Sequence, residues 1–171
     1  MSARCLRTLS KAIGIVIAML QTEAHGQSNF LDYNLKDAGY LAKLPEAPKK
    51  SAVIAAGGFL VPGEQVKRMF LGNTVYYTWL ATYRGVSRGA TSAAYHRDER
   101  HVVSVSRYGN GKPAALLWWM EGDARCTEQI DSHVPICRLI YELKDMTVQC
   151  IREEDICPIM IRVVPGNAEN L

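Results

Sequence analysis

The sequence predicts a mainly β protein, folded as a small up-and-down barrel of about eight antiparallel strands with one short N-terminal helix. Turn-forming residues recur roughly every 10 to 14 residues through the second half of the chain, which is the spacing of short strands joined by hairpins. No segment between them has a helical period long enough for a crossover, so we expect an antiparallel sheet. Closure into a barrel removes exposed strand edges. A two-sheet sandwich is the alternative, and Pro135 and Pro158 weaken the case for closure because proline suits strand starts and sheet edges.

Residues 1–26 have the features of a secretory signal peptide. A basic start is followed by the uninterrupted apolar run of residues 12–20 and then by small residues. This run is shorter than the roughly 20 residues that a membrane-spanning helix needs, so we expect a soluble periplasmic or secreted product and not an integral membrane protein. We expect cleavage after Gly26, with Ala24 as the alternative. A retained signal anchor or a buried N-terminal helix is the competing interpretation.

The remaining chain has the size of one domain and is nearly neutral. The full chain has a formal charge of +3, and removing the signal peptide, with its three basic residues and one acidic residue, leaves +1. Such a low charge gives no reason to expect nucleic acid as a partner. We divide the chain into an N-terminal arm, residues 27–61, and a β-barrel domain, residues 62–167. The arm is either mobile or a strap that docks on the barrel, and residues 51–60 are expected to include a short strand.

The predicted helix and the first long strand meet at Gly72. Pro62 suits a first helical turn, and a glycine in the left-handed conformation can end the helix at Gly72. The β-branched and aromatic run from Thr74 to Tyr83 predicts the first strand. The other strands are expected at residues 91–97, 101–107, 114–120, 124–129, 135–142, 146–152 and 156–164.

Four cysteines follow the signal peptide, and all of them lie in the last third of the chain: Cys126, Cys137, Cys150 and Cys157. An even number of cysteines in an exported chain predicts two disulfides, for which three pairings exist. We favour Cys126 with Cys137 and Cys150 with Cys157, because each pair closes a short loop between strands expected to be neighbours. A zinc site is disfavoured, because no two of these cysteines have the short spacing of zinc ligands.

Four short motifs, Leu71–Thr74, Tyr95–Glu99, Trp119–Cys126 and Ile136–Leu139, together resemble a pattern found in small exported proteobacterial proteins of unknown function with lipocalin-like barrels. The resemblance covers roughly residues 63–166. It implies a lipocalin-like barrel and an exported location, and it implies no reaction. The chain departs from the pattern in its second cysteine pair and in its long N-terminal arm.

Adjacent aromatic residues and clustered arginines suggest a binding surface. Tyrosine and tryptophan dominate the energetics of protein interfaces, and neighbouring residues of a strand point to opposite faces, so one member of each aromatic pair is expected outside the core. The alternative is that the barrel or the arm buries these aromatics and that the arginines form an ordinary solvated face. The candidate surface residues are Tyr76, Trp79, Trp118, Trp119, Arg97 and Arg107.

No pattern in the sequence assigns a catalytic, cofactor-binding or metal-binding residue. His96 and His101 flank a predicted hairpin turn, where a metal would have Asp98 or Glu99 nearby, but solvated histidines are the favoured interpretation.

Three functional hypotheses follow. The first is an exported, non-enzymatic barrel that binds another protein or an envelope component through the aromatic and arginine surface. The second is a periplasmic carrier that holds a small apolar or anionic ligand inside the barrel. The third is a hydrolase that uses His96 or His133 with a carboxylate.

Overall fold

The computed structural model describes residues 38–106, 111–129, 134–144 and 146–171. The predicted signal peptide and its cleavage site therefore lie outside the described residues. Among the described residues, no helix combines the length and the apolar character that crossing a membrane requires.

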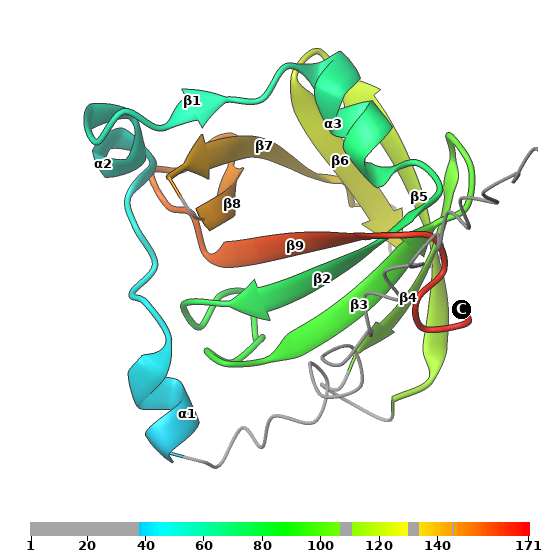
Figure 1. Ribbon diagram of the computed structural model, residues 1–171, viewed down its shortest axis with the longest axis horizontal. Helices are drawn as coiled ribbons and strands as arrows, with labels where there is room; N and C mark the ends of the chain where they lie inside the picture. The colour runs from blue at the N-terminus through cyan, green and yellow to red at the C-terminus, as the bar shows by residue number, and fades with distance from the viewer. Residues whose placement is uncertain (1–37, 107–110, 130–133, 145) are drawn as a thin grey trace, which may run out of the picture.

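Eight antiparallel strands, β2 to β9, form a closed up-and-down barrel (Figure 1). Each strand pairs with the next along the chain, and β2 pairs with β9 to close the sheet. The predicted fold class is confirmed, and the sandwich alternative is wrong. The strands are β2 (Asn73–Trp79), β3 (Thr91–His96), β4 (His101–Ser106), β5 (Pro113–Glu121), β6 (Ala124–Gln129), β7 (Ile136–Leu143), β8 (Met146–Ile151) and β9 (Ile159–Pro165).

The two prolines that weakened the case for closure lie just outside the ladders. Pro135 comes directly before β7, and Pro158 comes directly before β9. A missing backbone N–H at these positions costs the barrel no ladder hydrogen bond. The first strand is shorter than predicted, because the chain turns after Trp79 and Tyr83 pairs with Val86 in a tight turn.

The predicted helix is α3 (Gly63–Phe70), which lies over the ends of β5 and β6 (Figure 1). Gly72 follows it with a φ of +72°, the left-handed conformation that the sequence suggested. Val66 and Phe70 of α3 are fully buried and pack with inward-facing barrel residues such as Trp118. The helix therefore closes one end of the barrel.

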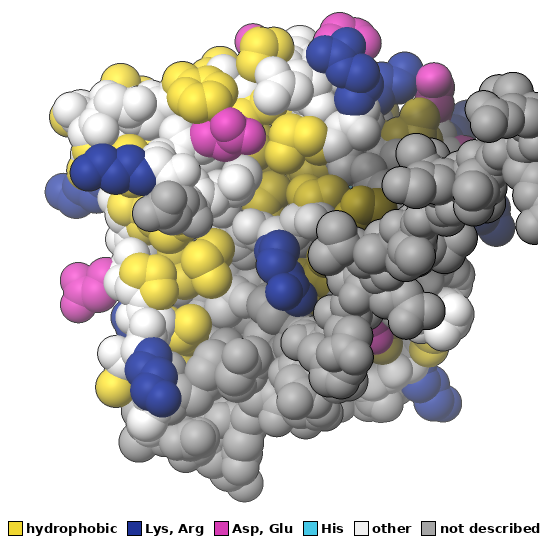
Figure 2. Space-filling model, viewed as in Figure 1, with side chains coloured by type: hydrophobic (Ala, Val, Ile, Leu, Met, Phe, Trp, Pro, Cys, Tyr) yellow, Lys and Arg dark blue, Asp and Glu magenta, His cyan; other side chains and the backbone are white. Residues whose placement is uncertain are grey.

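Two further short helices, α1 (Ala38–Lys43) and α2 (Lys50–Ala55), were not predicted. The segment from Pro48 to Leu60 docks on the outside of the barrel. Lys50 donates to the backbone carbonyl of Arg152 at 2.8 Å, Val53 is buried, and the two-residue strand β1 (Phe59–Leu60) pairs with β7. This part of the arm is a strap, and its short strand is confirmed. Figure 2 shows hydrophobic side chains gathered over α2, β1 and β7.

Both disulfides form with the favoured pairing, Cys126–Cys137 and Cys150–Cys157. Cys126 and Cys137 are direct partners across β6 and β7, so this bond staples two neighbouring strands. The second disulfide packs in the apolar layer between the strap and the outer face of the barrel.

Candidate functional site

A cavity of about 410 Å³ occupies the end of the barrel away from α3. Trp79, the last residue of β2, and Ile159, the first residue of β9, line it. Arg84 and Val134 also line it and are exposed, so the cavity opens to solvent at this end. Its volume lies at the lower end of the roughly 300–1,000 Å³ range of small-molecule sites.

Two arginines, Arg125 on β6 and Arg138 on β7, project into this cavity from directly opposed positions. Their exposed fractions are only 3% and 8%. Like charges placed opposite each other on adjacent strands repel, and burial removes the water that would screen them. The pair is therefore costly for the fold and needs a compensating interaction.

Arg125 is the deeper of the two arginines. Its Nη2 donates to Nε2 of His96 at 2.9 Å, and its guanidinium carbon lies 5.1 Å from the ring centre of Phe70 and 5.8 Å from that of Tyr77. Burial and the positive charge of Arg125 hold the pKa of His96 well below its usual value. His96 is therefore neutral, and because Nε2 accepts from Arg125, the ring proton is on Nδ1.

Arg138 has a weaker set of contacts. Its Nη1 donates to the hydroxyl of Thr127 at 3.2 Å, and burial together with the charge of Arg125 lowers its pKa to about 10. Glu128 also lines the cavity. Within the described part of the chain, no carboxylate forms an ion pair with Arg125 or Arg138.

Several buried polar atoms around the two arginines have no hydrogen-bond partner among the described residues. They are Nε of Arg125, Nε of Arg138, the hydroxyl of Tyr77 and both amide atoms of Gln149. Burial raises the pKa of Tyr77, and the two arginines oppose this rise. Native proteins leave few buried polar groups without partners, so such a group of donors and acceptors at one cavity indicates a binding site.

The candidate surface residues do not come together on one exposed face. Tyr76 and Trp118 are buried, which corrects their assignment to an exposed surface. Trp118 points into the barrel, and its Nε1 donates to the carbonyl of Asp98 at 2.7 Å. The Tyr76 hydroxyl donates to the Glu169 carboxylate, and its ring lies 5.0 Å from the guanidinium carbon of Arg162.

The remaining candidate residues are scattered. Trp79 lines the cavity, Trp119 is half-buried, and Arg97 is exposed with its Nε 3.6 Å from the Asp98 carboxylate. Arg107 and His133 lie outside the described residues.

His96 and His101 do not form a metal site with each other. His96 is buried and contacts Arg125, whereas His101 is exposed and its Nδ1 lies 2.9 Å from Asp98. The alternation of side chains along strands explains the separation, because His96 faces into the barrel and His101 faces out. The hypothesis of a hydrolytic His96 next to a carboxylate finds no support in these contacts.

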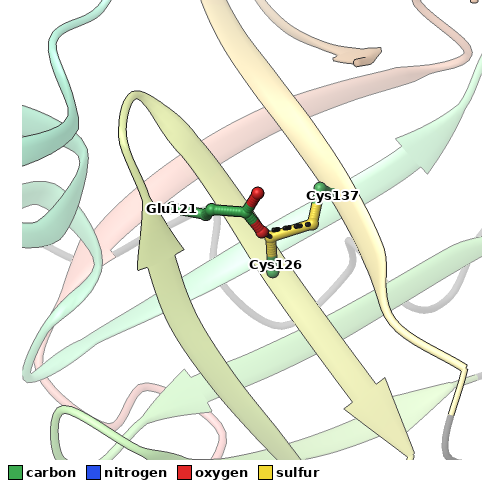
Figure 3. Close-up of side chains that lie close together, drawn as sticks. All are labelled: Glu121, Cys126 and Cys137. Carbon is green, nitrogen blue, oxygen red and sulfur yellow. Dashed lines mark hydrogen bonds between the residues drawn. A yellow bond between two sulfur atoms is a disulfide. The ribbon is translucent and has the colours of Figure 1, made fainter. Parts of the chain in front are cut away.

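The side chains of Glu121, Cys126 and Cys137 also lie close together (Figure 3). Oε2 of Glu121 is 3.7 Å from the sulfur of Cys126 and 3.9 Å from that of Cys137. The two sulfurs are bonded to each other and carry no hydrogen, so these are contacts without a donor and without a thiolate ligand. Oε1 of Glu121 instead forms an ion pair of 2.8 Å with Arg152.

Arg125, Arg138 and Gln149 were not among the predicted site residues, although the sequence carries one signal for the two arginines. If Cys126 and Cys137 pair across two strands on the outer face, their neighbours Arg125 and Arg138 must both point inward. The pairing therefore implied two opposed arginines in the barrel.

Comparison of the chain with protein-family models, with curated proteins and with solved structures finds no match.

Proposed function

We propose that this protein binds a small organic anion inside its barrel, as a carrier or receptor and not as an enzyme. The observation that carries the proposal is the opposed pair of buried arginines, which have no carboxylate partner among the described residues. An unpaired buried charge is among the most expensive features that a fold can keep. Two buried arginines at an open cavity therefore indicate that positive charge serves a function at this place.

An anion bound between the two guanidinium groups would offset this cost. Hydrogen bonds between arginine and an acidic group are about twice as strong as hydrogen bonds between neutral groups. The planar guanidinium can also form a bidentate pair of hydrogen bonds with a carboxylate. The unpaired Nε atoms and the Tyr77 hydroxyl supply donors at the same place. The cavity is of a size for one small molecule.

The contacts of His96 favour binding over catalysis. A general base needs a free ring nitrogen within reach of the substrate, and Nε2 of His96 already accepts from Arg125. The hypothesis of a surface that binds another protein is weakened, because two of its aromatic residues, Tyr76 and Trp118, are buried. The two disulfides are compatible with an oxidising, exported location.

Native mass spectrometry of the protein purified from the envelope of its own host tests the proposal. We compare the wild type with Arg138→Met, which removes one buried charge, and with Arg97→Met, which removes an exposed one. We expect the wild type and Arg97→Met to retain a small acidic molecule that Arg138→Met lacks. If the molecule is lost during purification, we expect hexanoate, benzoate or phosphate to raise the Tm of the wild type and of Arg97→Met. The proposal is wrong if the wild type carries no added mass and none of these anions raises its Tm.

A further inference from the structure

We infer that the anion is a single-chain amphiphile, an acidic head group on an apolar tail, and that it enters the barrel head first. This inference rests on the proposed function and adds the chemical class and the orientation of the ligand. The observation behind it is the way in which charge and apolar surface are distributed from the floor of the cavity to its mouth.

The floor of the cavity carries positive charge that no carboxylate of the described residues compensates. Arg125 reaches inward until its guanidinium lies against Phe70, the residue through which α3 closes the barrel. Arg138 lies beside it on β7, and the Tyr77 hydroxyl lies near both charges. An acidic head group therefore meets its donors at the bottom of the cavity.

The mouth carries apolar side chains, and its arginine has a carboxylate nearby. Trp79, Ile136 and Ile159 line it from the strand ends farthest from α3. Arg84, the arginine at the mouth, lies 3.9 Å from the Glu154 carboxylate and 5.4 Å from the ring centre of Tyr83. A head group thus gains more at the floor, and an apolar tail gains more at the mouth.

The size of the cavity limits the length of the tail. At the roughly 30 Å³ that a water molecule takes up in the liquid, 410 Å³ holds on the order of a dozen non-hydrogen atoms. This corresponds to a medium-length carboxylate such as decanoate. A two-tailed lipid is too large.

Isothermal titration calorimetry with straight-chain carboxylates from hexanoate to tetradecanoate tests the class of ligand, with 1-decanol as the uncharged control. Burial of each methylene is expected to raise the affinity about fourfold, up to about ten carbons, after which the tail extends into water and the affinity levels off. Decanol and the Arg138→Met variant are expected to bind at least tenfold more weakly. The Arg97→Met variant is expected to bind like the wild type.

Bromine quenching of tryptophan fluorescence tests the orientation, because Trp79 lies at the mouth and Trp118 lies near the closed end, 5.0 Å from His96 between ring centres. Head-first binding predicts that 10-bromodecanoate quenches Trp79 and that 2-bromodecanoate does not. The Trp79→Phe variant identifies this signal and should lose it.

The outcomes separate the two proposals. Affinity that does not change with chain length, but is lost in Arg138→Met, overturns the amphiphile and leaves the anion site standing. Quenching of Trp79 by 2-bromodecanoate and not by 10-bromodecanoate overturns the head-first orientation. Failure of every carboxylate and of phosphate to bind overturns both proposals.

Discussion

The two ends of the barrel interior are built from different kinds of residue. At the α3 end, Val66, Phe70 and Trp118 are almost completely buried against one another. At the opposite end, the interior holds Arg125 and Arg138 beside a cavity. Apolar packing of the first kind stabilises a fold, whereas buried unpaired charge of the second kind destabilises it. Stability is therefore concentrated at one end of this barrel, and the proposed anion site lies at the other.

The largest change in the free energy of unfolding is expected from a substitution at the closed end of the barrel. Replacing Phe70 with alanine removes a fully buried ring and leaves a cavity, which should lower the free energy of unfolding by about 3–5 kcal/mol. Urea unfolding followed by circular dichroism measures this change. Phe59→Ala is the matched control, because Phe59 is 53% exposed and its loss should change stability by less than about 0.5 kcal/mol. Similar losses in both variants would contradict the division between the two ends.

The two disulfides are expected to stabilise the fold equally and to differ in their effect on binding. They close loops of similar length, with sequence separations of 11 and 7, and each should contribute about 2.5 kcal/mol. Only Cys126–Cys137 holds the strands that carry the opposed arginines. Replacing this pair with alanines should weaken the binding of decanoate at least fivefold, as measured by calorimetry. The same change at Cys150 and Cys157 should leave the affinity unchanged, and equal affinities in the two variants would show that the staple does not position the arginines.

Removing one charge from the open end should make the fold more stable. Arg138→Met replaces a buried guanidinium with an apolar side chain of similar length, so the free energy of unfolding should rise by on the order of 1–2 kcal/mol while anion binding is lost. Urea unfolding without added anion measures the change, with Arg97→Met as the exposed control. A clear loss of stability in Arg138→Met would mean that the arginine is part of the structural core.

His96 is expected to make the stability of the protein depend on pH, with a smaller change in the free energy of unfolding. In the unfolded chain the imidazole takes up a proton near pH 6.5, whereas in the folded protein its pKa is well below that value. The unfolded state therefore binds more protons below pH 6.5. Stability that is complete above this pH should fall as the pH decreases, by up to about 1.4 kcal/mol per pH unit.

Unfolding midpoints in urea between pH 7 and pH 5 measure this dependence. His96→Gln cannot titrate in this range but keeps an acceptor for Arg125, so its stability should change less with pH. His101→Gln, at an exposed position, should keep the dependence of the wild type. The same slope in wild type and His96→Gln would rule out His96 as its source.

The fold was predictable because its signals are local. Each hairpin has its own turn residues, and the helix end at Gly72 needs only a residue that accepts a positive φ. The helix α2 was missed because a six-residue helix has little stability of its own. Its contacts, such as the one between Lys50 and the carbonyl of Arg152, come from the turn after β8, 102 residues away in the sequence.

The site was harder to predict because it depends on which face each residue occupies. Alternation shows that neighbours point to opposite sides, but it does not show which side is inside. Arg125 and Arg138 therefore resembled surface arginines, and Trp118 resembled a candidate for the outside. The predicted Cys126–Cys137 pair places both arginines on the same face, and the structure shows that this face is the inside of the barrel.

The ionisation of a bound carboxylate tests directly whether Arg125 and Arg138 bind the anion. Carbon-13 NMR of decanoate labelled at its carboxyl carbon, bound to the wild type and titrated over the pH range in which the protein stays folded, reports the pKa of that group. Contact with Arg125 and Arg138 predicts a bound pKa clearly below that of free decanoate, because two positive charges favour the ionised form. A pKa of the bound carboxylate equal to or above that of free decanoate would place the head group away from the arginines. It would rule out the proposed anion site at Arg125 and Arg138.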